Sequence, residues 1–484
     1  MRILGLNIFF ALVAMLLGMA AGHAQAPGEN PAAVPSVQPV PSSPVAPLFT
    51  GETKNARTVS ETSSSNNHPL AGAQELSLDN PESRRSYWQM FFNLTSTLDT
   101  NPLGVGRTFN AVPWGSLYGG ADLHLSSHRS DLSVDYLGGG VLSRYSNEDA
   151  PIQQLVLGEK VTWRRAAISL FDQFGYFPEA VSQVNLPASP DLTGNRQTSL
   201  QPVFLPNQSI ATTLGQELNN TFVGELDVNP TPRSSFTFLE SYSVARFLRA
   251  DLLDLNDTIL QAGFNRQLRR NNSVAVLYRF TGFRFTNFYQ PMDGHEVQLA
   301  FGRRITGRLA FRLSAGSELG IFRTAMATAP SASTAPTIAV FRHGYWTADS
   351  SMTYEIRRTA LRLGYDHGLT DGAGFLAGAI TDQVYASVNS QLSRRLTGEL
   401  TGGYARNRGV IATTEQPANE TYRNWFAGAT ISHALGRKAS VFLSYQMQRQ
   451  TTNFVCGGLG CGNDFTRQLI SLGVMGRSQP RPIG

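Results

Sequence analysis

The chain contains little charge and almost no lysine, and each shortage excludes a class of protein. Charged residues make up 15% of its 484 residues, whereas an average soluble domain carries about 25%. The 40 basic and 35 acidic residues leave a formal charge of +5, which over this length is too dilute to indicate a nucleic-acid partner. Lys54, Lys160 and Lys438 are the only lysines. This profile argues against an ordinary cytosolic enzyme and against a nucleic-acid-binding protein.

Long apolar runs are absent beyond the first segment. In that segment Arg2 precedes an apolar stretch over residues 3–21, and the small residues Gly22 and Ala24 flank His23. This pattern predicts a secretory signal peptide over residues 1–24, with an uncleaved anchor helix as the alternative. Past residue 26 no run of 18 apolar residues occurs, so the sequence offers no further membrane-spanning helix.

Aromatic residues are scarce between the signal peptide and Tyr87. Seven prolines fall between residues 27 and 47, and a run of serine and asparagine follows over residues 63–67. A segment of this composition buries too little apolar surface to offset its chain entropy. Residues 25–86 are therefore predicted to be a disordered Pro/Ser-rich linker, either a plain spacer or a tether toward the cell wall.

From residue 87 onward, apolar and polar residues alternate in runs of about 11 to 15 residues. His295, Val297 and Leu299 share one face of such a run, while Glu296 and Gln298 share the other. This period of two is typical of a strand with two different faces. Eighteen runs follow this pattern, and sixteen is the alternative because 87–97 and 165–175 are the weakest. The expected strands are 87–97, 114–125, 130–143, 153–163, 165–175, 217–228, 234–246, 257–268, 273–286, 294–305, 308–322, 344–357, 359–367, 379–392, 395–406, 421–433, 438–452 and 464–476.

The connections between these runs alternate between short and long. Arg164-Arg165 and Thr306-Gly307 are tight, whereas 176–216 and 323–343 are extended. Short turns at one end and long loops at the other are typical of outer-membrane barrels, and a β-sandwich gives no reason for this asymmetry. The sequence therefore predicts an all-β fold, a transmembrane antiparallel β-barrel over residues 87–476. A polar tail over 477–484 follows, and both chain ends are expected on the periplasmic, short-turn side.

The aromatic residues fit two girdles at the membrane interfaces, although a general preference of aromatics for strands explains part of the pattern. The residues expected at the long-loop end are Tyr176, Phe177, Phe283, Phe285, Phe288, Tyr289, Phe322, Tyr345, Trp346 and Trp425. Those expected at the short-turn end are Trp163, Phe236, Phe301, Phe311 and Tyr354.

In its signal peptide, strand rhythm and loop asymmetry the chain resembles bacterial outer-membrane β-barrel proteins and, among them, the porin-like channels. The resemblance includes no family-specific motif, and the last strand lacks the aromatic residue on which such barrels commonly end. It implies a Gram-negative outer-membrane channel for passive diffusion of small hydrophilic solutes, with membrane lipids and these solutes as partners. A homo-oligomer is compatible with it. The loop 176–216 is the third long connection, which in porins narrows the barrel; an external flap is the alternative.

The strand faces opposite the apolar ones are expected to line the lumen. Eighteen strands enclose a space wider than side chains can fill, which favours a water-filled channel over a plugged one. Ten acidic and four basic residues predict a preference for cations, because charge in a confined passage is weakly screened. These candidates are Asp131, Asp135, Lys160, Glu225, Asp227, Glu296, Arg304, Arg312, Glu318, Asp349, Glu355, Arg362, Asp366 and Glu399.

Other functions find less support in the sequence. A polysaccharide or other polymer export channel and a structural outer-membrane anchor are the alternatives to a porin-like channel. An enzyme is not expected, because the motifs of hydrolases, phosphate loops and zinc sites are absent. No cofactor and no metal site are expected either. Asp366 and His367 point to opposite faces of a strand, and Asp122 with His124 lacks a nucleophile.

Two local features carry predictions of their own. Cys456 and Cys461, the only cysteines, are expected to form a small disulfide-closed loop. Glu240 falls on the outward face of strand 234–246, where a charge facing lipid is costly. A β-bulge that shifts the register is the preferred interpretation, and a subunit interface over Glu240 is the alternative.

Overall fold

The computed structural model describes most of the chain beyond residue 85. The described ranges are 86–102, 111–143, 150–177, 216–248, 253–269, 271–285, 291–326, 337–356, 358–372, 376–410, 420–436, 438–453 and 464–483. The expected signal peptide, nearly all of the linker, most of loop 176–216 and the Cys456–Cys461 pair lie outside these residues. In the described part of the chain, no helix is long and apolar enough to cross a membrane.

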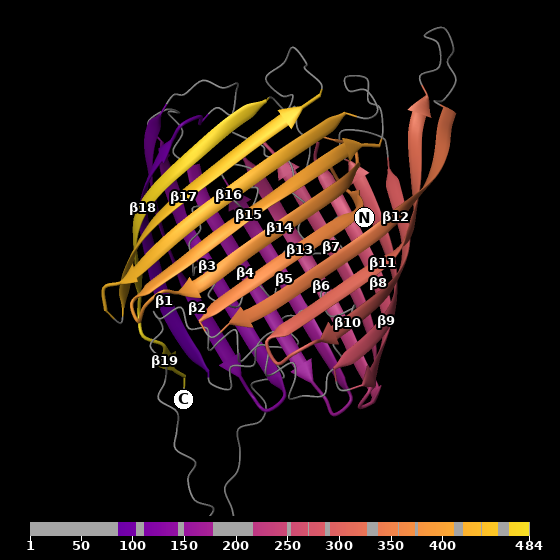
Figure 1. Ribbon diagram of the computed structural model, residues 1–484, viewed down its shortest axis with the longest axis horizontal. Coiled ribbons are helices and arrows are strands. Elements are labelled where there is room, and N and C mark those ends of the chain that lie inside the picture. The colour runs from indigo at the N-terminus through magenta and orange to yellow at the C-terminus, as the bar shows by residue number, and fades with distance from the viewer. Residues whose placement is uncertain are drawn as a thin grey trace, which may run out of the picture. The chain divides into compact units, whose positions relative to one another are not determined.

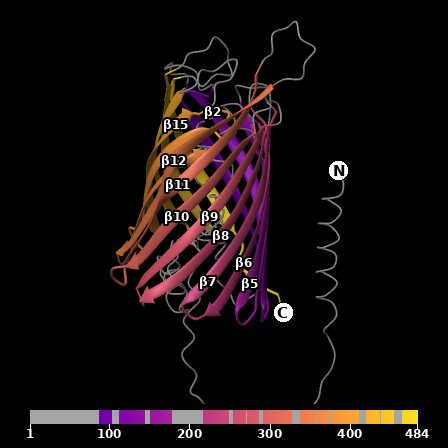
Figure 2. The same ribbon diagram turned by 90° about the vertical axis from the view of Figure 1, so that its right-hand side faces the viewer.

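Eighteen antiparallel strands close into a barrel (Figures 1 and 2). Each strand pairs with its neighbour in the chain, and β1 pairs with β18 to close the sheet. This confirms the predicted fold, including both of the weakest strands. The strands are β1 Tyr87–Asp99, β2 Val112–Ser126, β3 Ser130–Ser143, β4 Ala150–Thr162, β5 Ala166–Phe177, β6 Glu217–Thr231, β7 Ser234–Phe247, β8 Leu255–Arg269, β9 Asn272–Phe285, β10 Met292–Arg304, β11 Leu309–Met326, β12 Thr337–Ile356, β13 Thr359–Thr370, β14 Ala379–Gln391, β15 Leu396–Gly409, β16 Thr421–Ala434, β17 Ala439–Thr452 and β18 Phe465–Arg477.

Alternation along each strand gives the barrel its two faces. In β1, Met90, Phe92 and Leu94 are more than half exposed on the outside, while Asn93 and Thr95 are buried on the inside. In a bilayer, the outward apolar face suits the lipid and the inward face keeps the polar side chains away from it. A closed sheet without edges also pairs the backbone groups of every strand. The barrel therefore has the architecture of an outer-membrane protein.

A buried ion pair joins the first and last strands near the long-loop end. Arg467 Nε of β18 donates to Asp99 Oδ2 of β1 at 2.9 Å, and the two side chains are 4% and 1% exposed. Further along the same seam, the hydroxyls of Thr97 and Ser471 are hydrogen-bonded at 2.9 Å. The closure therefore has polar side-chain contacts in addition to its backbone ladder.

The C-terminal segment continues the pairing instead of leaving the barrel as a tail. β18 extends to Arg477, one residue beyond the expected end of the barrel, and β19 (Arg481–Pro482) then pairs with β1. The Arg481 guanidinium lies 5.2 Å from the ring centre of Trp88, and Gln89 Nε2 donates to the Ser478 carbonyl at 2.6 Å. These contacts give the polar residues of this segment partners on β1.

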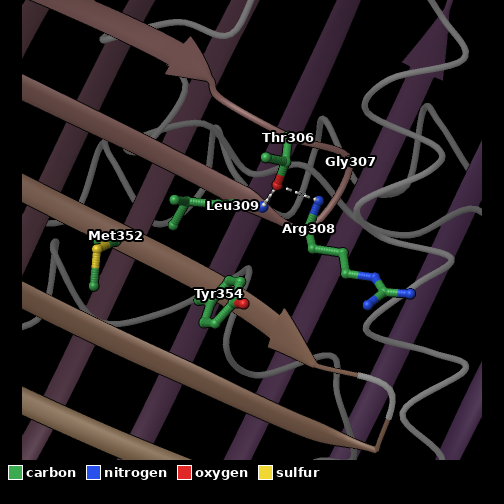
Figure 3. Close-up of a pocket in the computed structure, with 6 residues that line it drawn as sticks. All are labelled: Thr306, Gly307, Arg308, Leu309, Met352 and Tyr354. Carbon is green, nitrogen blue, oxygen red and sulfur yellow. Dashed lines mark hydrogen bonds between the residues drawn. The ribbon is translucent and has the colours of Figure 1, made fainter.

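The short turns are held by side chains that bond their own backbone. In the β10–β11 turn, Thr306 Oγ1 accepts from the backbone N–H groups of Arg308 and Leu309 at 3.2 and 3.0 Å (Figure 3). Leu309 also lines a shallow groove with Met352 and Tyr354, all three on the outward face of the barrel. The groove thus lies outside the interior, at the short-turn end.

The predicted bulge at Glu240 is wrong. The pairing of β7 with β6 and β8 is continuous through this residue, with Gly224 and Leu260 directly opposite Glu240. Glu240 is exposed on the same face as Phe238 and Tyr242. The irregularities of β6 and β8 occur near the short turns instead, where turn geometry absorbs the extra residue.

The expected long-loop girdle is only partly correct. Trp346 and Trp425 are more than half exposed on the outside, as predicted. Phe283, Phe285 and Phe322 are buried and belong to an internal apolar cluster, because their positions in the ladder face inward. Strand periodicity alone did not separate these residues, since both faces are aromatic at this end of the barrel.

Candidate functional site

The inner wall carries the residues that the sequence proposed for the lumen. Each occupies a ladder position that faces inward, on the face opposite to the exposed apolar side chains. Glu225, Glu296 and Glu318 are buried, and the side chain of Glu355 lies outside the described residues. The partly exposed members are Asp131, Asp135, Lys160, Asp227, Arg304, Arg312, Asp349, Arg362, Asp366 and Glu399.

Four of these acids form an inward acidic wall across neighbouring strands. Glu296 of β10 lies directly opposite Glu318 of β11, and Asp349 of β12 lies directly opposite Asp366 of β13. Like charges placed opposite each other in an antiparallel pair repel. The wall consequently attracts positive charge, whether from the protein or from a solute.

Two arginines supply part of that positive charge. Arg279 of β9 contacts Glu296 at 3.1 Å, and Arg312 of β11 contacts Asp349 at 3.2 Å. Arg279 was not among the predicted lumen residues, although it occupies an inward-facing position of β9. Its contribution leaves the four wall acids in excess over the two arginines that contact them.

A glutamate of the wall also holds the upper part of β13. Glu318 Oε2 accepts from the backbone N–H of Leu369 at 3.2 Å, across the intervening strand β12. The pairing of β12 with β13 stops at Ala348 and His367, so the end of β13 parts from β12 at this height while it stays paired with β14. The acidic wall thus also positions the connection that follows β13.

That connection includes a crossing segment, Leu376–Gly378, which packs on two parts of the inner wall. Leu376 is buried with Tyr422 of β16, whereas Ala377 is buried against Met292 and the other inward residues at the long-loop ends of β7–β11. Gly378 has a left-handed φ of 92°, and a Cβ there would meet Met292 Sδ at 2.7 Å. The described chain therefore narrows the interior here. The sequence instead predicted the constriction in loop 176–216, nearly all of which lies outside the described residues.

Other parts of the interior are apolar or already paired. Phe171, Val223 and Leu239 form a buried apolar patch on β5–β7. At the short-turn end, Arg477 Nη2 donates to Asp122 Oδ2 at 2.9 Å. There His124 Nε2 also contacts Asp131 Oδ1 at 3.0 Å, which gives this histidine a structural partner.

Parts of the inner wall are covered by other protein atoms and parts are solvated. Inward polar residues such as Asn93, Ser314 and Asn407 are 0% exposed, so protein atoms cover the wall at these positions. On β12–β15, by contrast, inward Asp349, Arg362 and other charged groups are only half-buried. The solvated part of the interior thus includes the β12–β15 wall.

The described residues bring no catalytic constellation together. Asp366 faces inward, while His367 faces outward, where its Nδ1 lies 2.6 Å from Asp382 Oδ1 and its ring stacks on Trp346 at 3.7 Å. Within the described ranges no group of three or more His, Cys, Asp or Glu residues could hold a metal ion.

Comparison with known proteins gives similarity of fold at low identity. No family model matches the chain, and no curated protein matches it. Among solved structures, Pseudomonas aeruginosa OccK2 (OpdF) in complex with glucuronate shares 9% identity over 82% of this chain and 98% of its own, with a TM-score of 0.40. A BenF-like porin from Pseudomonas fluorescens Pf-5 gives the same four values. The ferric citrate transporter FecA shares 10% identity over 79% of this chain and 62% of its own, with a TM-score of 0.42.

Proposed function

We propose that the protein is a porin-like outer-membrane channel through which small hydrophilic solutes diffuse, with a preference for cations. The observation that carries this proposal is the inward acidic wall, in which Glu296 opposes Glu318 and Asp349 opposes Asp366. The Asp349 side chain is 28% exposed, so part of the wall meets solvent. Acidic rings and walls select cations in a confined pore because charge there is weakly screened.

The crossing segment Leu376–Gly378 sets the size class of the solute. It packs on the inner wall beneath the long-loop end. A wide polymer would need an open lumen at this place. This favours ions and small molecules over the polymer-export alternative. Loop 176–216 as a second constriction remains a prediction.

A planar-bilayer recording tests this function. The purified full-length chain should form discrete conducting channels, and in a salt gradient the reversal potential should show the cation as the more permeant ion. Channels with clear anion preference would overturn the lumen assignment. A purified barrel that inserts without any conductance would overturn the channel itself.

The placement in the membrane is part of the same proposal. We place the short turns and both chain ends in the periplasm, because outer-membrane barrels have short periplasmic turns and long external loops. A protease recognition site inserted at Gly307, in a short turn, should resist external protease on intact cells. It should be cut after the outer membrane is opened. Cleavage on intact cells would reverse the orientation.

A homo-oligomer would explain why Glu240 is exposed among apolar residues on the outer face. A photocrosslinker placed at position 240 should then yield a covalent dimer, and the same crosslinker at Leu400, outward on β15, serves as the control. Crosslinking to lipid alone at both positions would show that Glu240 faces the bilayer.

A further inference from the structure

We propose that the outer face of β15–β17 carries a binding site for the phosphate group of an anionic lipid. The site consists of Arg406, Arg408, Arg423 and Arg449, which we call the arginine patch. All four side chains are exposed, and all alternate with buried inward residues, so they point away from the interior. Figure 1 shows the three strands side by side. The inference rests on the barrel lying in a membrane and not on what passes through it.

The pairing register places two of these charges face to face. Arg406 of β15 is directly opposite Arg423 of β16, a position at which opposed Cα atoms lie about 4.5–5.5 Å apart. Like charges directly opposite each other are destabilising. An anion bound between the two guanidinium groups would remove that repulsion, and arginine matches the geometry of phosphate oxygens.

Within the part of the chain that the structure describes, too few acids lie near the patch to neutralise it. Asp382 lies opposite Arg406, but its carboxylate is hydrogen-bonded to His367. Asp464, beyond the end of β17, accepts from the backbone N–H of Thr452 at 2.7 Å. Among the described residues no ion pair reaches any of the four arginines, so four positive charges face two acids that already have partners.

Three other outward arginines at the long-loop end, Arg246, Arg284 and Arg323, are satisfied by the protein. Arg284 and Arg323 both bond the carboxylate of Asp293. Arg246 donates to two backbone carbonyls and to Asn256 Oδ1. The arginine patch differs from them because its charges have no comparable acceptors among the described residues, which leaves room for an external anion.

Neighbouring aromatic residues place the patch at the depth of lipid headgroups. Tyr404 and Trp425 are opposed in the ladder and their rings lie 4.3 Å apart. Aromatic pairs of this kind mark the interface of a bilayer. Arg406 and Arg423 are each two residues closer to the long-loop end, about 7 Å at 3.3 Å per residue.

The surface on the other side of the aromatic pair suits an acyl chain. Leu400, Ile431 and Leu443 are about half exposed on the outward face there. Between them and the aromatic pair, Gly402 leaves a gap, because a Cβ added to it would meet only the Phe426 carbonyl oxygen, at 3.6 Å. Basic, aromatic and apolar surfaces thus follow one another in the order of a lipid's phosphate, interface and chain.

Native mass spectrometry of the full chain in neutral detergent tests this site. The probes are phosphatidylglycerol, whose headgroup is anionic, and phosphatidylcholine, whose headgroup is neutral overall. The double variant Arg406→Gln/Arg423→Gln should bind phosphatidylglycerol roughly 25-fold more weakly than the unchanged protein, at about a fivefold loss for each arginine. Binding of phosphatidylcholine should not change.

The matched control is the double variant Arg303→Gln/Arg308→Gln at the opposite end of the barrel, where Arg303 is outward on β10 and Arg308 lies in the following turn. This variant should retain phosphatidylglycerol binding. Equal losses in both double variants would overturn the site, because charge alone would then explain binding. No loss in the Arg406→Gln/Arg423→Gln variant would also overturn it. Displacement of the lipid by an equal concentration of inorganic phosphate would assign the patch to free phosphate instead. Heat-modifiable gel migration checks that each variant is folded, and its conductance is recorded separately.

Discussion

Single residues decide where the barrel tolerates charge. Asp99 and Arg467 are both nearly inaccessible, yet each satisfies the other across the seam. Removing one member of such a buried pair leaves the other charged and unpaired, which costs more than the pair contributes. Glu420 shows the opposite case, a buried carboxyl that accepts a hydrogen bond from Tyr422 and has no basic partner among the described residues.

The seam pair gives a stability prediction. Asp99→Asn should lower the free energy of unfolding by about 3–5 kcal/mol, because Arg467 is left charged in a buried site. Urea unfolding in detergent, followed by gel migration, measures the change. The double variant Asp99→Leu/Arg467→Met should recover a large part of the loss, and a double variant as unstable as the single one would contradict this explanation.

Glu420, which precedes β16, gives a pH prediction. Burial raises the pKa of its carboxyl above the ordinary value, partly offset by a hydrogen bond from Tyr422. Its charged form is therefore disfavoured in the fold, so stability should rise as the pH falls through the folded-state pKa. Glu420→Gln should remove this dependence and raise the melting temperature at neutral pH. An unchanged pH profile in the variant would show that another group titrates.

At the scale of elements, the strands were predictable and the crossing segment was not. The alternation of His295, Val297 and Leu299 with Glu296 and Gln298 fixes a strand and its two faces from local sequence. It says nothing of contacts between distant strands, so the inward packing of Leu376–Gly378 and the pairing of β19 with β1 escaped prediction. Arg279 could have been predicted from the sequence, because the alternation along its strand alone places it on the inward face.

The crossing segment gives a conductance prediction. Gly378→Ala places a Cβ at a left-handed φ and against Met292, which disfavours the segment's present conformation by about 1–2 kcal/mol. Displacement of the segment should raise the mean single-channel conductance or its fluctuations. Gly307→Ala is the matched control, since its Cβ would meet nothing within 4 Å. Identical recordings for both variants would mean that the segment does not restrict the passage.

Over the whole molecule, charge is distributed by face. Acids gather on the inner wall of β10–β13. Arginines that form no ion pair with any described residue gather outside on β15–β17. The formal charge of +5 hides this separation, because it sums two surfaces that meet different environments. The alternation along the strands identifies most of the charged residues that face inward. Only the pairing register of the structure shows which of these charges lie opposite each other.

This separation gives a selectivity prediction. Glu296→Gln/Glu318→Gln removes one opposed acidic pair from the inner wall and should reduce the cation preference measured by reversal potential. Glu240→Gln removes an acid from the outer face and should leave the reversal potential unchanged. Equal shifts in the two variants would mean that overall charge, and not the inner wall, controls permeation.

The seam between β1 and β18 also has a consequence for the rate of folding. All other paired strands of the 18-strand barrel are consecutive in the chain and can form as local hairpins, whereas Asp99 and Arg467 are separated by 368 positions. Joining such distant segments carries a loop-closure entropy cost that only the final contacts repay. Closure should therefore be the slow step of folding, and the seam should be the last part of the sheet to become protected from hydrogen exchange.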